Sequence, residues 1–300
     1  MLKKNFFLKD NIFIFNINNK TTNVVEKFYR DKPFPNYSKN EDKRSILEKG
    51  NKNLFMSNLK REVGNGKYFL EAGSGTSQLS IYLGTGTNNK IFALDSALNS
   101  LRLGSAFAKQ QGISNINFIN ADILDLDSVF DDSSFDYVWS SGVLHHTENP
   151  RQCFKLLCSK LKKNGIFILG LYNSYGRART LIRKFFFKIF GEKIVFFLDP
   201  VLRRLSKDFS KNKEKIESWI QDQYSHPVES THSYGEVLSW FRENNIRYLN
   251  CYPNIFQDTG GFFTEQAAPN FFERAIMQIS MIFTKLGGEG GLFIFIGKKE

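Results

Sequence analysis

The sequence predicts an α/β protein whose core is a doubly wound parallel sheet. Short apolar runs alternate with helical patterns between residues 65 and 172, which is the order expected of such a sheet. The first run ends at Glu71 and turns at Gly73 and Gly75 into a helical stretch, and the second run ends in Asp95, twenty residues beyond Gly75. Glycines let the backbone approach a ligand, and a carboxylate at this spacing can bind ribose hydroxyls. The pattern therefore indicates a nucleotide-binding unit.

Residues 1–64 form a separate N-terminal segment in this interpretation. Residues 11–17 alternate enough for a short strand, and the apolar spacing over residues 42–63 predicts one or two helices beside the first core strand. Between them, two prolines in residues 32–37 forbid helix and make a stiff aromatic segment. This segment either fills the edge of the core or covers the ligand. As a lid, it would use Phe34, Asn36 and Tyr37.

The later core elements are predicted from the residues at their ends. Ser96 can cap a helix that runs to about Gln111 and is ended by Gly112. Four further elements follow: strands at 115–119 and 135–140, a helix from Asn149 and Pro150 to about Lys163, and a strand at 166–172. The last strand is almost continuously apolar, as expected of a strand that is covered on both faces.

The C-terminal third is predicted to complete the sheet. Ser233 and Glu236 have the spacing of a capping box, which marks the start of a helix. Strands are expected at 246–252 and 292–296, with an extra helix at 271–283 crossing between them. We therefore divide the chain into an N-terminal segment (1–64), a ligand-binding core (65–172), an insertion that roofs the substrate pocket (173–232) and the C-terminal part of the sheet (233–300).

Two nucleotide ligands fit the spacing to Asp95, and the glycine turn separates them. A dinucleotide site needs a third small residue for close helix packing, but Gln78 stands at that position. Glu71, just before the first glycine, would repel a pyrophosphate, whereas S-adenosylmethionine has no phosphate and carries a sulfonium and an ammonium. Asp122 adds a further acid at the end of the third core strand. These residues favour S-adenosylmethionine over NAD.

Four stretches carry a resemblance to a known family. They are the Glu-x-Gly-x-Gly-Thr turn at 71–76, Ala-Leu-Asp-Ser at 93–96, Asn-Ala-Asp-Ile at 120–123 and the block at 135–146. Together they resemble class I S-adenosylmethionine-dependent methyltransferases, and the last block is most similar to the group that includes the ubiquinone- and menaquinone-biosynthesis methyltransferases. The resemblance is good over residues 67–172 and thin outside them. It implies a Rossmann-like, mostly parallel sheet whose last strand is antiparallel.

The resemblance also implies S-adenosylmethionine as the cofactor and assigns residues to it. Glu71, Gly73 and Gly75 would line the methionine part, Asp95 the ribose, and Asp122 with Ile123 the adenine. We add Ser96 and Ser140 to the cofactor site. One departure is Ser77, where many members have a glycine, and a small hydroxyl should be tolerated there.

Length and cysteine usage set further bounds. Three hundred residues make one large domain, or one domain with a cap. Three cysteines, an odd number without metal spacing, are typical of free thiols in a reducing cytoplasm. Residues 1–17 are apolar but broken by Lys9 and Asp10, so neither a signal peptide nor a membrane span is convincing. We expect a cytoplasmic protein.

Candidate catalytic residues follow the fourth core strand, where the acceptor side of this fold lies. Methyl transfer is an in-line displacement, so a base is needed only if the acceptor must first lose a proton. His145 and His146 are the candidates for that base, although one of them could instead cap a helix or bond the backbone.

The roof insertion and the end of the fifth strand supply the predicted substrate contacts. Tyr172 and Arg177 follow that strand and face the same pocket by topology, while His226, Glu229 and His232 form a cluster near the end of the insertion. The spacing of this cluster suggests a metal, but there is no other group of ligands near it in sequence, and we predict no metal site. Contact with substrate or a structural hydrogen-bond network is the favoured interpretation.

Positive charge is concentrated in the same insertion. Residues 177–215 hold twelve Lys and Arg against four Asp and Glu, which is +8 of the net +11. Residues 177–190 have the pattern of a helix with an apolar stripe, opposite a basic face formed by Arg183, Lys184 and Lys188 that also exposes Phe187. The stripe could pack on the insertion's own core. Alternatively, the helix could lie in the headgroup plane of an anionic membrane, on the inner face of that membrane.

The functional hypothesis is a methyltransferase that acts on an oxygen or carbon nucleophile of a small or lipid-like metabolite. Two alternatives remain. The basic insertion could bind RNA, although no RNA-binding module is recognisable and we expect no nucleic-acid partner. The protein could also hold S-adenosylmethionine without turnover, although the residues for cofactor binding are all in place.

Overall fold

The centre of the molecule is a mixed sheet of nine strands among the residues described by the computed structural model, which are 1–3, 6–30, 37, 41–256, 261–283 and 291–300. The strand order is β1-β2-β5-β4-β3-β6-β7-β9-β8. The strands are β1 (Phe7–Lys9), β2 (Ile12–Ile14), β3 (Tyr68–Ala72), β4 (Lys90–Asp95), β5 (Ile116–Asn120), β6 (Phe135–Ser141), β7 (Leu161–Tyr172), β8 (Ile246–Tyr252) and β9 (Leu292–Lys299). Neighbouring strands from β2 to β7 are parallel.

The C-terminal strands confirm the expected antiparallel end of the sheet. The last strand, β9, inserts between β7 and β8 and runs antiparallel to both. The crossing helix is α13 (Phe271–Phe283), with the predicted bounds. The Rossmann-like fold class predicted from the sequence is therefore confirmed, including the strand that reverses direction.

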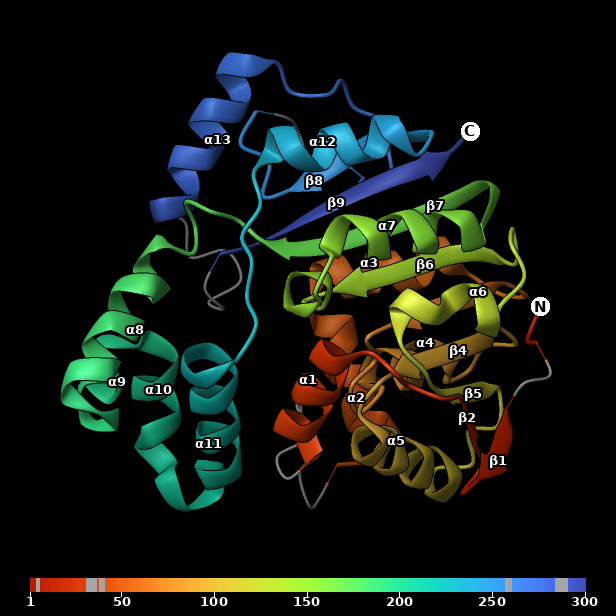
Figure 1. The fold of residues 1–300 in the computed structure, drawn as a ribbon, viewed down its shortest axis with the longest axis horizontal. Helices are drawn as coiled ribbons and strands as arrows, with labels where there is room; N and C mark the ends of the chain where they lie inside the picture. Colours follow the sequence, from red (N-terminus) through yellow and green to blue (C-terminus); the bar gives the residue numbers. More distant parts are fainter. Residues whose placement is uncertain (4–5, 31–36, 38–40, 257–260, 284–290) are drawn as a thin grey trace.

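Two apolar cores lie on the two faces of the sheet, and Figure 1 shows the helices that cover them. One core is built with α2 (Lys43–Lys52), α3 (Leu54–Val63), α4 (Gln78–Gly84) and α5 (Leu98–Gln110). The other uses α6 (Leu126–Val129), α7 (Pro150–Lys160), α12 (Tyr234–Glu243) and α13. Buried parallel strands between two helical layers account for the near-continuous apolar runs of the sequence.

Helix ends agree with the sequence in some places and correct it in others. The predicted capping box of α12 and the Asn149 cap of α7 are present. Ser96 does not cap α5, because the capping position is Ala97 and has no side-chain hydrogen bond there. Helix α7 ends at Lys160, not near Lys163, because Leu161 already pairs with Phe135 in the sheet.

The N-terminal segment contains one helix that the sequence interpretation missed. Helix α1 (Lys20–Arg30) follows the β1–β2 hairpin and has no fully buried residue. Its start is marked by Asn19, whose side-chain oxygen accepts the backbone N–H of Thr22 at 2.9 Å. The prediction of one or two helices over residues 42–63 is met by α2 and α3.

The roof insertion is helical and has a small core of its own. It contains α8 (Ala178–Phe190), α9 (Glu192–Leu198), α10 (Pro200–Leu205) and α11 (Phe209–Ser225), with a short 3₁₀ turn at Ser206–Asp208. Two further 3₁₀ turns, at Ile123–Asp125 and Leu144–His146, lie in the core. Its buried residues include Val195, Leu202, Ile216 and Trp219. Figure 1 shows these helices as a group at one side of the sheet. In the part of the chain that the structure describes, no helix is long and apolar enough to cross a membrane.

Candidate active site

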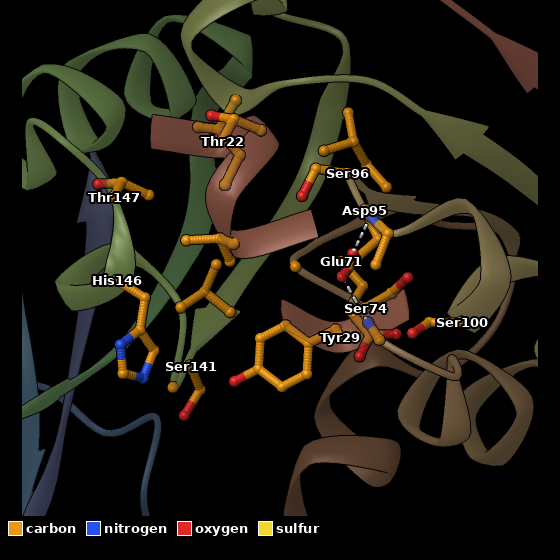
Figure 2. A pocket seen from close by; sticks show the side chains of 18 of the residues that line it. Thr22, Tyr29, Glu71, Ser74, Asp95, Ser96, Ser100, Ser141, His146 and Thr147 are labelled. Carbon is orange, nitrogen blue, oxygen red and sulfur yellow. Dashed lines mark hydrogen bonds between the residues drawn. The ribbon is translucent and has the colours of Figure 1, made fainter. Parts of the chain in front are cut away.

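A cavity of about 450 Å³ lies at the carboxyl ends of β3, β4 and β6. Parallel α/β sheets bind ligands at this edge, because the glycine turns and the helix N-termini meet there. Figure 2 shows polar side chains that line the cavity, with Glu71, Ser74 and Asp95 on one side and Ser141 and His146 on another. The cavity therefore brings the predicted cofactor residues together with His146, one of the two predicted catalytic residues.

The glycine turn between β3 and α4 has little freedom to accept side chains. Gly73 has φ +81°, and a Cβ added there would lie 2.2 Å from Cγ2 of Val143. Ser77 also adopts the left-handed conformation, with φ +63°, and its hydroxyl lies 3.1 Å from that of Ser74. The left-handed backbone gives a physical reason for glycine at this position in related sequences, and Ser77 is accommodated in it.

Two acids beside the glycine turn, Glu71 and Asp95, have raised pKa values. Glu71 accepts hydrogen bonds from the backbone N–H and the hydroxyl of Ser80. Burial, together with the nearby charge of Asp95, raises the pKa of Glu71 to about 8 in spite of these bonds. Burial also raises the pKa of Asp95, although its two oxygens accept the backbone N–H groups of Gly75 at 2.7 Å and Ala97 at 2.8 Å. Such a pair favours a cationic ligand.

The N-terminal helix α1 closes the cavity from the side of Asp122. One oxygen of Asp122 accepts the hydroxyl of Thr22, and the other accepts the backbone N–H of Leu124 at 2.9 Å. Tyr29 of the same helix also lines the cavity, and in Figure 2 its ring lies between Ser141 and Ser74. The residues that cover this side of the ligand site thus come from α1, which no sequence argument had assigned to it.

All four histidines of the chain lie near one another beside the cavity, but only His146 lines it. Its Nδ1 is 2.7 Å from the carbonyl oxygen of Val228. A carbonyl only accepts, so Nδ1 carries the proton and Nε2 keeps its lone pair. Burial lowers the pKa of His146 to about 4. His146 is therefore a neutral imidazole at neutral pH, fixed in one tautomer.

Aromatic rings stack behind His146. His146 stacks on His226 at 3.6 Å between ring centroids, and His145 lies against His146 at 4.2 Å. His145 in turn stacks on Tyr172, with 3.8 Å between the ring centroids. The guanidinium carbon of Arg177 lies 3.9 Å from the centroid of the Tyr172 ring. We call these five residues the histidine stack. It connects the end of β7 with the roof insertion.

A buried ion cluster anchors the stack. Arg177 donates from Nε and Nη2 to the two oxygens of Glu229, both at 2.8 Å, and Lys184 donates to the same carboxylate at 2.6 Å. Burial alone would raise the pKa of Glu229, but these bonds and charges outweigh it and lower that pKa to about 2. Paired in this way, Glu229 stabilises the insertion and is not available as a base.

The predicted site residues divide into three groups. Nine of them line the cavity, namely Glu71, Gly73, Gly75, Asp95, Ser96, Asp122, Ile123, His146 and Tyr172. Seven lie outside its lining, namely Tyr37, Ser140, His145, Arg177, His226, Glu229 and His232. Phe34 and Asn36 lie outside the described residues.

Three of the predicted residues outside the cavity lining have well-defined positions in the structure. The hydroxyl of Tyr37 donates to the carbonyl of Thr76 at 2.6 Å, behind the glycine turn. Ser140 and His145 are fully buried, and within the described structure neither the Ser140 hydroxyl nor the ring nitrogens of His145 have hydrogen-bond partners. Burial also lowers the pKa of His145 well below its usual value. Its position indicates a packing role in the stack.

Several lining residues were missed by the sequence interpretation. They are Thr22, Val25 and Tyr29 of α1, Trp219 and Gln223 of α11, and Gln78, Ser141 and Thr147. The cap at Asn19 and the apolar spacing of Val25, Phe28 and Tyr29 are the signals that could have indicated α1. No local pattern could have placed α11 over the cavity.

Comparison with known proteins decides the family. A family model described as a methyltransferase domain matches residues 64–245, which is more than half of the chain. The chain belongs to this methyltransferase family. The predictions of a class I S-adenosylmethionine-dependent methyltransferase, and of S-adenosylmethionine as its cofactor, are thereby confirmed.

Individual relatives of this methyltransferase are distant. It is 31% identical over 91 residues to a ubiquinone biosynthesis O-methyltransferase from Rickettsia conorii, covering 30% of each chain. It is 27% identical over 131 residues to a sarcosine/dimethylglycine N-methyltransferase from Halorhodospira halochloris, covering 43% of this chain and 46% of the relative. The chain thus spans less than half the length of these curated relatives.

A solved structure shows the same fold. Geranyl diphosphate C-methyltransferase from Streptomyces coelicolor, in a complex that contains S-adenosyl-L-homocysteine, has a TM-score of 0.51 and 12% sequence identity. The alignment covers 95% of this methyltransferase and all of that chain (100%). At this identity the likeness concerns the fold alone.

The cavity of this methyltransferase has the chemistry that its cofactor requires. Glu71, a buried acid that resists ionisation, suits a sulfonium or an ammonium, because the cation would stabilise its charged carboxylate. The remaining acceptor positions of Asp95 suit the ribose hydroxyls. Ser74, Gln78 and the carboxylate of Asp122 complete a polar lining at the edge of the sheet. S-adenosylmethionine supplies the electrophilic methyl group when it is bound there.

The raised pKa of Glu71 predicts that binding of S-adenosylmethionine releases a proton. With a pKa of about 8, Glu71 is protonated in the ligand-free protein at pH 7, and the cationic ligand favours its ionised form. Calorimetry at pH 7 in buffers of different ionisation enthalpy should therefore report proton release, up to one proton for each ligand bound. The Glu71→Gln variant should release less. Equal release by the two proteins would contradict this role of Glu71.

Proposed function

We propose that this protein transfers the methyl group of S-adenosylmethionine to an oxygen or carbon nucleophile of a small or lipid-like metabolite. The observation that carries the proposal is His146, a neutral imidazole in the cavity wall whose tautomer leaves Nε2 able to accept a proton. Oxygen and carbon acids must lose a proton when they are methylated, so a positioned base is useful. Its removal typically costs such reactions a factor of about 10²–10⁴.

The surrounding residues support an enclosed, partly apolar acceptor site. Trp219 and Gln223 of α11 close the cavity, and the side chain of Gln223 donates to the hydroxyl of Tyr172 at 3.1 Å. Gln221 of the same helix donates to the backbone carbonyl of Phe28 in α1 at 2.6 Å, so the roof and the N-terminal helix meet over the site. Enclosure holds the reactants in line and excludes water, and good orientation can contribute about 7–11 kcal/mol.

In the proposed reaction, the protein's own groups position the acceptor and move one proton. The acceptor's O–H or acidic C–H proton would pass to Nε2 of His146 as the new bond to the methyl carbon forms and the bond from that carbon to the cofactor's sulfur breaks, with neutral S-adenosylhomocysteine as the leaving group. Tyr172 and Trp219 would hold an acceptor with an apolar or aromatic body against the wall. The similarity to a ubiquinone biosynthesis O-methyltransferase supports an oxygen acceptor of this kind without fixing one.

A comparative assay tests the proposal. The purified protein is incubated with radiolabelled S-adenosylmethionine and, separately, with polyprenyl phenols, small catechols or hydroxy acids, and bulk RNA. We expect methyl transfer to a phenolic or carbon acid acceptor. Transfer to RNA alone would support the nucleic-acid alternative. Tight cofactor binding with no transfer to any of these acceptors would contradict the proposal and favour a non-catalytic binding protein.

A further inference from the structure

Helix α8 turns its apolar side chains away from the protein. Leu181, Ile182, Phe185, Ile189 and Phe190 are between 48% and 61% exposed. With about 100° of rotation per residue, the first four of these share one stripe, and the exposed Arg179 and Lys188 lie on either side of it. An apolar stripe between two flanking cations is typical of a helix that lies at an interface.

The inner face of α8 corrects the prediction from the sequence. Phe187, expected to be exposed on a basic face, is partly buried, and its ring lies 5.5 Å from that of Tyr224 in the insertion's core. Arg183 pairs with Asp199 at 3.3 Å and Lys184 with Glu229 at 2.6 Å, so two of the expected surface cations are neutralised inside. The apolar stripe therefore does not pack on the insertion's own core.

A second helix has the same arrangement. On α13, Met277 and Met281 are buried, whereas Phe272, Ile276, Ile279 and Phe283 are between 50% and 75% exposed. These four residues are spaced by three or four positions and so share one stripe. We call the outward residues of α8 and α13 named here the docking face. Single exposed apolar residues are common in proteins, but two helices with whole stripes exposed indicate an interaction site.

The two helices approach each other beside the active site. A Cβ on Gly176, just before α8, would lie 3.1 Å from Cε of Met281 near the end of α13 and 2.8 Å from Cα of Gly291. The next residue, Leu292, lines the cavity. Figure 1 shows α8 and α13 on the same side of the molecule. The docking face thus lies near one wall of the cavity.

The charge around the docking face selects its partner. Residues 177–215 of the insertion carry +8 of the net charge of +11, and Lys193, Arg203 and Arg204 are exposed on α9 and α10. A second copy of the chain docked symmetrically would place two such basic segments against each other, which is unfavourable. An anionic surface with an apolar interior complements both the cations and the exposed phenylalanines.

We propose that α8 and α13 dock this protein on the surface of an anionic lipid bilayer. The phenylalanine and isoleucine side chains of the docking face enter the boundary between headgroups and acyl chains, and Arg179 and Lys188 contact the lipid phosphates. Each basic residue close to an anionic surface strengthens binding about fivefold. Binding to vesicles is measured without any methyl acceptor, so the result is independent of the proposed reaction.

Vesicle flotation of the full chain with S-adenosylmethionine bound tests the proposal. Vesicles of phosphatidylcholine with about one third phosphatidylglycerol are compared with pure phosphatidylcholine at about 0.05 M and 0.5 M salt. We expect binding to the anionic vesicles at low salt, and weaker binding at high salt or to neutral vesicles. The variant Arg179→Glu with Lys188→Glu should bind at least 25-fold more weakly, by about fivefold for each cation removed.

Apolar substitutions and matched controls complete the test. Ile182→Ser, Phe185→Ser and Ile189→Ser combined should also reduce binding, as should Ile276→Ser with Ile279→Ser. As controls, Leu54→Ser with Leu103→Ser removes exposed apolar residues from α3 and α5, and Lys52→Glu with Lys109→Glu reverses exposed charges on other helices. Both controls should bind as the wild type does. Unchanged cofactor affinity verifies that each variant is folded.

Three outcomes would overturn the proposal. The first is no binding of the wild type to anionic vesicles at low salt. The second is a docking-face variant that is folded and binds as well as the wild type. The third is sedimentation showing a dimer that the triple α8 variant abolishes, together with no vesicle binding, which would assign the face to a second copy of the chain.

Discussion

Replacing Asp95 with alanine should weaken S-adenosylmethionine binding by about 1.5–3 kcal/mol, the range for hydrogen bonds to a charged group. This is roughly 10- to 150-fold in Kd. A carboxylate has about four acceptor sites, and the backbone N–H groups of Gly75 and Ala97 use two of them. The other two can accept the ribose hydroxyls without any rearrangement. Isothermal titration calorimetry measures the change.

A carboxylate at the opposite end of the sheet provides the control. Asp136 also accepts a backbone N–H, from Tyr68 at 2.8 Å, but it lies at the start of β6 and outside the cavity lining. Asp136→Ala should therefore lower the thermal stability while leaving the Kd unchanged. A folded Asp95→Ala protein with wild-type affinity would remove Asp95 from the cofactor site.

Replacing His146 with alanine should lower kcat by about 10²–10⁴, the typical contribution of a general base, with little change in the Kd of S-adenosylmethionine. Because burial places the pKa of His146 near 4, the wild-type imidazole is already neutral at pH 5 and above. Activity that depends on this base should thus be constant above about pH 5 and be lost as the pH falls through 4. Steady-state kinetics from pH 4 to 8 test this expectation.

The acidity of the acceptor separates a base from a structural residue. An acceptor that is ionised before it binds needs no base, so His146→Ala should lose far less activity with a low-pKa phenol than with a high-pKa one. Added imidazole should restore part of the lost rate. Equal losses for both acceptors, with no rescue, would mean that His146 supports the cavity wall only by packing on His226.

Much of the core was predictable from the sequence, because its signals are local. The glycine turn, the apolar runs, the Asn149 cap and the capping box at Ser233 each involve residues a few positions apart, and each is present in the structure. The end of α7 was predicted too late, since Asn164 and its glycine lie inside β7 and do not end the helix. Pairing of Leu161 with Phe135, a contact distant in sequence, ended the helix earlier.

The features that the sequence did not predict depend on contacts between residues that are distant in the chain. The pattern of α8 showed an apolar and a basic face but not which one points inward. The carboxylates of Asp199 and Glu229 decided that by pairing with Arg183 and Lys184. Likewise, His145 and His146 are neighbours with the same side chain. Only the position of the Val228 carbonyl and of the Tyr172 ring separates a wall residue from a buried one.

Trp219 gives this methyltransferase an optical signal of its own. Of the three tryptophans, Trp139 and Trp240 are buried in the two cores of the sheet, and Trp219 alone is among the residues that line the cavity. Its indole N–H donates to Asp199 at 3.0 Å, which fixes the ring in the roof. Changes in indole emission on adding a ligand can therefore be attributed to this one residue by comparison with a Trp219→Phe protein. Unlabelled compounds could be screened for entry into the cavity by fluorescence alone, before any methyl acceptor is known.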